Sequence, residues 1–467
     1  MHHLRRNKMI HDNAWTTYSA DDLKKLEDLG ADYIAFLNNG KTERECTEQI
    51  AAMAKEHGYR DLAEVIANDE KLSKGDKVFA VNMGKMVMTL DIGDDIVNDG
   101  LNIIGSHIDS PRLDIKQNPL YESEELAYLD THYYGGIKKY QYVTMPLALH
   151  GVVVKPDGTS IKINIGEKDG EPVFMISDLL VHLAGEQMQK TAGKVIEGEA
   201  LDILVGCKPL NGEEKDAVKA AVLKLLKDEY DIDEDDFVSA EIEAVPAGSA
   251  REAGLDRSMI VGYGQDDRSC AYTALAALME VSGPKTTSCG LFVDKEEIGS
   301  VGATSMESHF FENMVREVLD RMGIYSEIAL ARCLRNSRML SSDVSMAYDP
   351  LYSDKFEKKN TARLGHGLSI KKFTGVRGKS HANDANAEYL AQLRRMLDKH
   401  GVVYQTSELG KVDAGGGGTI AYILSLYGMQ VVDCGVPILS MHAPWETLSK
   451  SDLYEAFKGY KAFLTEG

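Results

Sequence analysis

Residues 264–300 read GQDDRSCAYTALAALMEVSGPKTTSCGLFVDKEEIGS, and this stretch decides the fold. Apolar residues at helical spacing predict a helix near residues 269–280, and the apolar run 290–293 predicts a buried strand. Carboxylates stand before the helix and after the strand: Asp266, Asp267, Asp294, Glu296 and Glu297. A helix followed by a strand that ends in acidic residues is typical of a layered α/β domain, in which ligands gather beyond the carboxyl ends of the strands.

The same alternation extends in both directions along the chain. Upstream, Ser19 is expected to cap one helix, and Thr42 with Glu45 forms a capping box for a second helix that ends near Gly58. Strands are expected at 78–81, 86–90 and 101–104. Downstream, the pattern predicts helix 307–321, strand 338–340, helix 385–399, strand 402–406, helix 419–427, strand 430–433 and helix 450–464. Both ends of the chain therefore belong to one α/β domain.

The stretch between these parts has a different texture. Strand-like runs at 141–154 and 160–165 dominate it, with amphipathic helices expected around 177–190 and 213–230. We therefore predict a discontinuous catalytic domain, residues 1–116 and 246–467, interrupted by a β-rich insertion, residues 117–245.

Composition excludes several classes of protein. The 467 residues carry 52 Lys plus Arg against 73 Asp plus Glu, a formal net charge of −21, which opposes binding to nucleic acid. The six cysteines are scattered without a CxxC pair, which favours a reducing compartment. No apolar run has the length of a signal peptide core or of a membrane span. We expect a cytoplasmic protein that binds neither nucleic acid nor membrane.

Two stretches that follow expected strands carry a histidine. His107 comes directly after strand 101–104, and Asp109 two residues later can hydrogen-bond its imidazole and fix the ligating tautomer. His442 follows another apolar run. Taken alone, His107 is explained as well by a surface or core histidine beside an incidental aspartate, and His442 by a core histidine with satisfied hydrogen bonds.

Three further stretches carry carboxylates. Asp266 alone would be explained by helix capping, and Asp343 alone by a turn. Glu296 and Glu297 are different, because adjacent carboxylates at the end of a buried strand are costly to desolvate without a metal or a cationic partner. One of them can bind a metal while the other acts as general base. Together the histidines and carboxylates form a nitrogen and oxygen ligand set that suits zinc, manganese or cobalt.

Five blocks, in this order, resemble the M18 aminopeptidases, the aspartyl aminopeptidase family of zinc exopeptidases. They are SHIDSPR at 106–112, DDR at 266–268, DKEEIGS at 294–300, SSDVSMAYDP at 341–350 and SMHAPWE at 440–446. The resemblance spans nearly the whole chain. It implies a zinc-exopeptidase-like mixed sheet flanked by helices, with the β-rich insertion serving as a dimerisation or lid domain. It also implies a homo-oligomer, built from dimers into a dodecamer.

The resemblance further implies a role for each site residue. Asp266 would bridge two divalent metal ions, zinc being the expected metal. His107 and Asp343 would complete one ion, and Glu297 and His442 the other, the assignment of pairs to ions staying open. Glu296 would be the general base, Asp109 would orient His107, and His182 is a candidate for a histidine that reaches a neighbouring subunit's active site. A histidine on an amphipathic helix explains His182 equally well.

The expected reaction is therefore removal of the first residue from peptides with a free N-terminus. Preference for an acidic first residue would need a cation in the first side-chain pocket, and the candidates are Lys371 and Lys372, with Arg377, Lys379 and His381 nearby. A solvated loop explains these basic residues as well. Which residue is preferred stays open, because their block departs from the N-K/Q-R-Y pattern of the aspartyl-specific members. The glycine run within 413–419 can bind an anion or can allow close backbone packing. Two alternative functions are a related two-metal N-acyl amino acid deacylase or carboxypeptidase, and a non-catalytic assembly protein.

Overall fold

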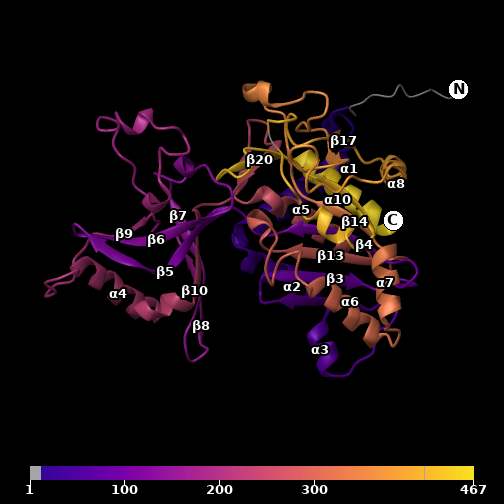
Figure 1. Ribbon diagram of the computed structural model, residues 1–467, viewed down its shortest axis with the longest axis horizontal. Helices are drawn as coiled ribbons and strands as arrows, with labels where there is room; N and C mark the ends of the chain where they lie inside the picture. The colour runs from indigo at the N-terminus through magenta and orange to yellow at the C-terminus, as the bar shows by residue number, and fades with distance from the viewer. Residues whose placement is uncertain (1–11, 415, 467) are drawn as a thin grey trace. The chain divides into compact units, whose positions relative to one another are not determined.

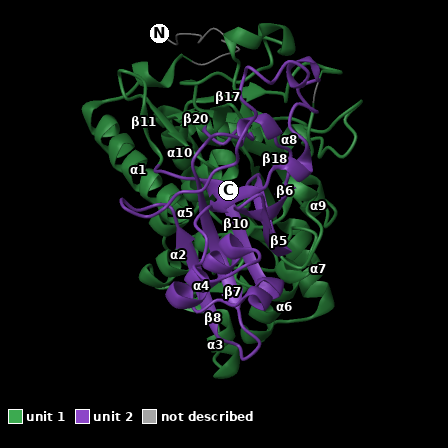
Figure 2. Ribbon diagram, turned by 90° about the vertical axis from the view of Figure 1, so that its left-hand side faces the viewer, with its two compact units in different colours: residues 1–109, 250–441, 446–467 green, residues 110–249, 442–445 purple. Residues whose placement is uncertain are grey.

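The computed structural model describes residues 12–414 and 416–466, which fall into two compact units (Figure 2). The first unit comprises Met1–Asp109, Ala250–Met441 and Glu446–Gly467. The second comprises Ser110–Ser249 together with His442–Trp445. Among the helices of the described ranges, none combines the length and the hydropathy needed to span a bilayer.

A nine-stranded mixed sheet forms the centre of the first unit (Figure 1). Parallel pairing joins β4 to β13 and to β14, and β14 to β18, whereas β3 pairs antiparallel with β13 and β16 antiparallel with β18. In spatial order the strands are β1 (Arg60–Asp61), β2 (Lys77–Asn82), β3 (Met86–Asp91), β13 (Thr287–Val293), β4 (Leu101–His107), β14 (Arg338–Ser342), β18 (Gln430–Gly435), β16 (Leu368–Lys371) and β17 (Tyr404–Ser407).

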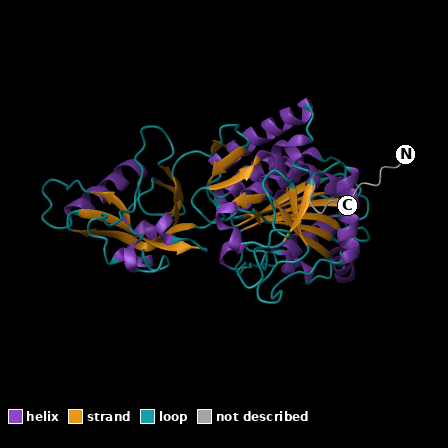
Figure 3. Ribbon diagram, turned by 90° about the horizontal axis from the view of Figure 1, so that it is seen from above, coloured by secondary structure: helices purple, strands orange, loops and turns teal. Residues whose placement is uncertain are grey.

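Helices cover both faces of this sheet, as the colouring of Figure 3 makes visible. One core lies between the sheet and α1 (Ala20–Asn39), α2 (Glu43–Glu56), α5 (Gln265–Glu280), α8 (Ala387–Lys399) and α10 (Lys450–Glu466). The other lies between the sheet and α3 (Leu62–Ala67), α6 (Phe310–Arg321), α7 (Glu327–Asn336) and α9 (Ala421–Ser425). Consecutive residues of one strand enter different cores, as Ile103 and Ile104 do. The predicted α/β fold with a mixed sheet flanked by helices is confirmed.

Local signals in the sequence explain where several helices begin. Ser19 caps α1 through a capping box with Asp22, and Thr42 caps α2 through a capping box with Glu45, as predicted for Thr42. The expected helix 419–427 is wrong at both ends, since α9 extends only over Ala421–Ser425. The glycine run before it supplies no capping side chain, and Gly428 follows with a positive φ.

A second, smaller sheet of the first unit carries the chain toward the site. Its order is β11 (Arg251–Ala253), β12 (Met259–Gly262), β20 (Glu446–Ser449), β19 (Pro437–Leu439) and β15 (Ser345–Met346). Two site segments adjoin strands of this sheet along the chain. The helix α5 directly follows β12, and the turn that contains His442 precedes β20.

The second unit is β-rich. Its six-stranded sheet has the order β8 (Ser160–Ile165), β7 (Leu147–Val154), β10 (Ala240–Pro246), β5 (Arg112–Ser123), β6 (Leu126–Tyr134) and β9 (Ile203–Gly206). The helix α4 (Ala217–Tyr230) packs against this sheet, and apolar side chains of both fill the core of the unit.

The amphipathic helix expected at 177–190 is wrong. This segment forms turns and one short 3-10 helix, Gln187–Gln189. Its apolar side chains stay exposed, among them Val181 at 75% and Leu183 at 68%. An amphipathic helix is stabilised mainly by packing of its apolar face. Because these side chains pack against no core of the second unit, the periodicity alone does not produce a helix here.

Candidate active site

The carboxyl ends of three neighbouring parallel strands define the site. β4 ends at His107, β13 ends directly before Asp294, and β14 ends directly before Asp343. Since these strands run parallel, their ends meet at one edge of the sheet, the position where open α/β sheets bind ligands. The first turn of α5 brings Asp266 to the same edge, because α5 packs against β4.

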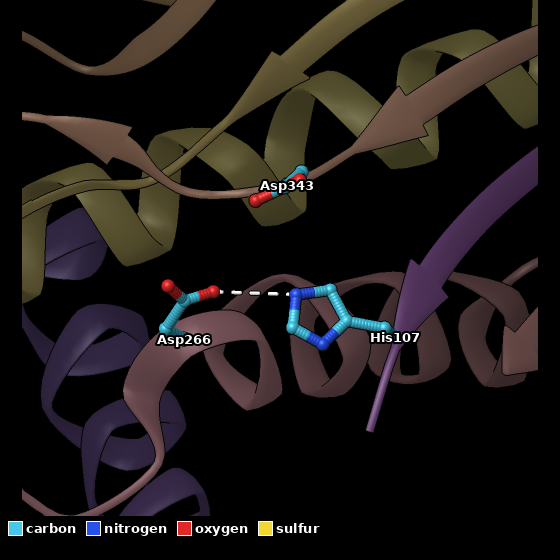
Figure 4. Close-up of side chains that lie close together, drawn as sticks. All are labelled: His107, Asp266 and Asp343. Carbon is cyan, nitrogen blue, oxygen red and sulfur yellow. Dashed lines mark ion pairs between the residues drawn. The ribbon is translucent and has the colours of Figure 1, made fainter. Parts of the chain in front are cut away.

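His107, Asp266 and Asp343 form a first group of potential metal ligands (Figure 4). One ligand atom from each lies within 4.8 Å of the other two. The imidazole Nε2 of His107 is 3.3 Å from Asp266 Oδ1, and both side chains are buried. Asp266 has a backbone ψ of 108°, outside the helical range, and its N–H donates to the Glu446 carboxylate over 3.0 Å. The side chain of Asp266 points at His107, a contact that the capping alternative does not require.

Asp109 connects the histidine with the glutamate pair. Its Oδ1 lies 3.3 Å from His107 Nδ1, and its backbone oxygen lies 3.0 Å from the same nitrogen. The backbone N–H groups of Glu296 and Glu297 donate to Asp109 Oδ1 and Oδ2, each over 3.2 Å. Asp109 thus receives the Nδ1–H of His107, leaves Nε2 directed at Asp266, and fixes the turn that presents both glutamates.

Glu296 and Glu297 lie in the short 3-10 helix η6 (Glu296–Ile298) after β13. They form a second group of potential ligands with His107, again within 4.8 Å. The Glu296 carboxylate is 3.9 Å from His107 Nε2, and 18% of its side chain is exposed. Burial, opposed by the charge of His107 and assisted by Asp343, Asp109 and Asp266, raises the pKa of Glu296 to about 8.

Three further residues, to which the sequence pattern alone assigned no role, support this site. Asp267 is fully buried and accepts the backbone N–H of His107 over 3.3 Å. Arg268 donates to the backbone oxygen of Ile108 and to that of Lys41. Glu446 holds Asp266, as described above. The adjacent letters DDR carried the signal for two of these residues, whereas Glu446 lies 180 residues away from its partner along the chain.

His442 and His182 belong to the second unit. His442 lies in the turn between β19 and β20 with a φ of 64°, and its Nδ1 is 3.0 Å from the backbone oxygen of Gly136. A hydrogen bond from Nδ1 leaves Nε2 as the ligating nitrogen. His182 is exposed in the segment of turns at 177–190.

The basic side chains considered for substrate selection have different surroundings. Lys371 is 2% exposed, and its ammonium donates to the backbone oxygens of Asp343 and Val344. Lys372, Arg377, Lys379 and His381 are exposed, and Lys379 pairs with Asp384 over 3.1 Å. Residues 373–379 and 408–413 line a cavity of about 320 Å³. The cationic candidates therefore do not converge on one acceptor.

The glycine run is closely packed. The N–H of Gly375 donates to the backbone oxygen of Gly417 over 2.7 Å, and a Cβ on Gly416 would lie 2.5 Å from the Gly375 oxygen. This arrangement favours close backbone packing, the second of the two interpretations of residues 413–419.

The donor set fits divalent cations. One imidazole, the buried carboxylate of Asp266 and three partly buried carboxylates converge, an arrangement that is costly without positive charge among the oxygens. These carboxylates act on the imidazole of His107. Burial lowers its pKa, but hydrogen bonds to Asp109 and Asp266 outweigh burial, so that the pKa lies well above its usual value. A cluster that attracts a proton so strongly also attracts a metal ion. Nitrogen and oxygen ligands without thiolate suit zinc and similar ions.

Comparisons with known proteins agree with this geometry. Residues 36–464 match the family model described as Aminopeptidase I zinc metalloprotease (M18). A probable M18 family aminopeptidase 1 of Clostridium acetobutylicum is 57% identical over 453 residues, which cover 97% of each chain. A probable M18 family aminopeptidase 1 of Thermotoga maritima is 44% identical over 458 residues, covering 98% of this chain and 99% of the relative.

Solved structures give the same result. The M18 aminopeptidase from Thermotoga maritima superposes with a TM-score of 0.94 at 44% identity, covering 98% of this chain and all of the other. Aminopeptidase I from Clostridium acetobutylicum superposes with a TM-score of 0.91 at 55% identity, covering 97% and 98%. The yeast mApe1 dodecamer, at 18% identity and a TM-score of 0.74 over 94% and 97% of the two chains, shares the fold.

The resemblance seen in the five sequence blocks is thereby confirmed, and so is the predicted activity, rather than the deacylase or assembly alternatives. The family is one of zinc metalloproteases, so its catalysis depends on a divalent metal. The chain belongs to the M18 family and is an aminopeptidase, an enzyme that hydrolyses the N-terminal residue from peptides.

Proposed function

We propose that this aminopeptidase works with two divalent metal ions, zinc being the expected metal and manganese or cobalt the alternatives. Asp266 would be shared by both ions, with His107 and Asp343 completing one and Glu297 and His442 the other. The convergence of His107, Asp266, Asp343, Glu296 and Glu297 at one sheet edge is the observation that supports this set. His442 lies four residues before Glu446, whose carboxylate accepts the backbone N–H of Asp266.

Bound divalent ions would lower the pKa of a water molecule and polarise the scissile carbonyl group. Glu296 is the residue that moves the proton. Its carboxylate accepts a proton from the attacking water as the new C–O bond forms, and it returns this proton to the leaving nitrogen as the C–N bond breaks. Asp109 keeps Glu296 in position through the two backbone N–H groups of the turn. The reaction consumes one water and releases one amino acid.

In this proposal the peptide substrate must carry a free N-terminus. We further propose that residues 117–245 form the module inserted into the catalytic domain. We also propose that the protein forms a homo-oligomer, with dimers assembling into a dodecamer. Exposed apolar side chains at 177–190 support an interface, among them Leu179, Leu180, Val181, Leu183 and Met188. In such an assembly His182 would reach a neighbouring active site. Light scattering on the purified protein tests this assembly, and a monomer at micromolar concentration contradicts it.

All six cysteines are free thiols, and five of them are buried, which supports the proposal of a reducing, cytoplasmic location. Fractionation of cells that express the protein tests this location. Recovery with an exported marker, instead of with a cytoplasmic one, contradicts it.

A substrate panel tests the mechanism. Aminoacyl-p-nitroanilides and short peptides are offered to chelated protein before and after zinc, manganese or cobalt is restored, with N-acetylated peptides as controls. We expect cleavage of free N-termini by metallated protein only. Glu296→Gln should lose about 10²- to 10⁴-fold in kcat, the usual contribution of a general base, while keeping two metal ions by elemental analysis. Glu64→Gln, a change on the exposed face of α3, should match wild type. Cleavage that survives Glu296→Gln removes the proposed role of this residue.

A further inference from the structure

Lys371 is a buried cation that the reaction does not use. It is the last residue of β16, and only 2% of it is exposed. Its Nζ donates to the backbone oxygen of Asp343 over 3.0 Å and to that of Val344 over 2.9 Å. These two carbonyl groups belong to the segment directly after β14, where Asp343 leaves the sheet. Burying an ammonium group is costly, so its position calls for a compensating role.

The strand β18 lies between β14 and β16, because it pairs with β14 on one side and with β16 on the other. Its Asp433 is the residue opposite Lys371 in the register, is fully buried, and experiences the charge of Lys371. The hydroxyl of Thr419 donates to Oδ1 of the same carboxylate. Lys371 therefore hydrogen-bonds two carbonyl oxygens at the site and lies in the strand register beside a buried carboxylate whose pKa its charge lowers.

The consequence concerns the position of Asp343. Its N–H donates to the backbone oxygen of Cys434 over 2.8 Å, and its own oxygen accepts from Lys371. Both backbone polar groups of Asp343 are thus fixed, one by β18 and one by the ammonium. A ligand whose backbone is fixed in this way needs little reordering when a metal ion binds.

We propose that Lys371 is a positioning residue for metal binding, which acts through the backbone of Asp343 and does not contact the substrate. The inference rests on the proposed function, since it requires Asp343 to be a ligand. It replaces the earlier interpretation of Lys371 as a cation of the substrate pocket. Lys372, the next residue, has an exposed side chain and supplies a matched comparison.

Zinc titration of the chelated full-length protein, followed by calorimetry in competition with a chelator, tests this proposal. Lys371→Met removes the donor and keeps the length of the side chain. We expect it to weaken one of the two zinc-binding events about 10- to 100-fold, the usual loss for a supporting partner of a ligand, and to leave the other unchanged. At saturating zinc, KM for substrates with acidic, neutral and basic first residues should stay within about twofold of wild type. Lys372→Met should bind zinc as wild type does.

Other outcomes overturn the proposal. Unchanged zinc binding in Lys371→Met, with a rise of KM confined to acidic substrates, would place the ammonium in the substrate pocket. Equal weakening of both binding events would indicate general loss of structure, which circular dichroism and thermal unfolding would detect independently. If Lys371→Met does not fold, Lys371→Arg replaces it. We again expect weaker zinc affinity in one binding event only. Unchanged zinc affinity, or equal weakening of both binding events, overturns the proposal.

Asp343→Asn separates this proposal from the ligand set. If Asp343→Asn binds both ions like wild type, Asp343 is not a ligand and the proposed function fails at this residue. If Asp343→Asn loses one ion while Lys371→Met binds normally, only the positioning role fails.

Discussion

Replacing Asp109 with asparagine tests how the glutamate turn is held. The carboxylate accepts two backbone N–H groups, one from Glu296 and one from Glu297, and it also faces His107. An amide of the same shape offers one oxygen instead of two, so one of the two N–H groups then meets an NH₂ donor. Because Asp109 is fully buried, water does not replace the lost acceptor.

The size of the effect follows from that single hydrogen bond. A hydrogen bond to a charged acceptor contributes about 1.5–3 kcal/mol. If the loss falls on the position of Glu296 in the transition state, kcat decreases about 10- to 150-fold, since about 1.4 kcal/mol corresponds to a factor of ten. KM should change little at saturating zinc, because in the proposed mechanism the turn contributes the base Glu296 and the ligand Glu297 but no substrate contact.

Steady-state kinetics at saturating zinc, with metal content measured on the same samples, decides the matter. Asp21→Asn serves as control, because Asp21 is exposed in the first turn of α1 and pairs with Lys25 at the surface. A kcat for Asp109→Asn equal to that of wild type would refute the positioning of Glu296 by Asp109. A decrease that is matched by a loss of bound metal in the same samples would refute it as well, since Asp109 would then act through the proposed ligands His107 or Glu297.

Two further substitutions address packing, one next to Asp343 and one elsewhere in the interior. A Cβ on Gly435 would lie 1.9 Å from the backbone oxygen of Asp343, so Gly435→Ala should push the end of β14 away from β18, weaken zinc binding and destabilise the protein by about 1–3 kcal/mol in urea unfolding. Gly185→Ala, where a Cβ meets nothing within 4 Å, is the control, and equal behaviour of the two variants contradicts the clash. The carboxyl group of Asp452 accepts the N–H groups of Gly365 and Gly367 in the interior, so Asp452→Ala should cost about 2–4 kcal/mol in the same assay, and a loss below about 1 kcal/mol would contradict this.

Sequence reasoning predicted best what depends on neighbours along the chain. The capping box of α2 and the strand ends at His107 and before Glu296 and Asp343 are local features, and the structure contains each of them. The parallel pairing of β4 with β13 and β14 then brings these ends together, as the general rule for such sheets states.

Contacts across long sequence separations were beyond that reasoning. The spacing of His107 and Asp109 indicated one contact, yet Asp109 also holds the turn 187 residues later. Lys371 lies in a basic run that looks like a solvated loop, but its position at the end of β16 buries it among backbone oxygens. The helical period of 177–190 was misleading for the opposite reason, because no partner surface of the second unit covers it.

The placement of the buried cations bears on how an acidic site stays open to metal ions. Arg268 donates to the backbone oxygens of Ile108 and Lys41, and Lys371 to those of Asp343 and Val344. Each cation thus hydrogen-bonds the backbone at or next to a proposed ligand, Ile108 being the neighbour of His107. A cation bound to a carboxylate would occupy the oxygen atoms that a metal needs, whereas a cation bound to a carbonyl reduces the electrostatic cost of the cluster and leaves those atoms to the metal. Exchanging Lys371 for a residue that reaches a carboxylate should therefore inhibit metal binding more than its simple removal does.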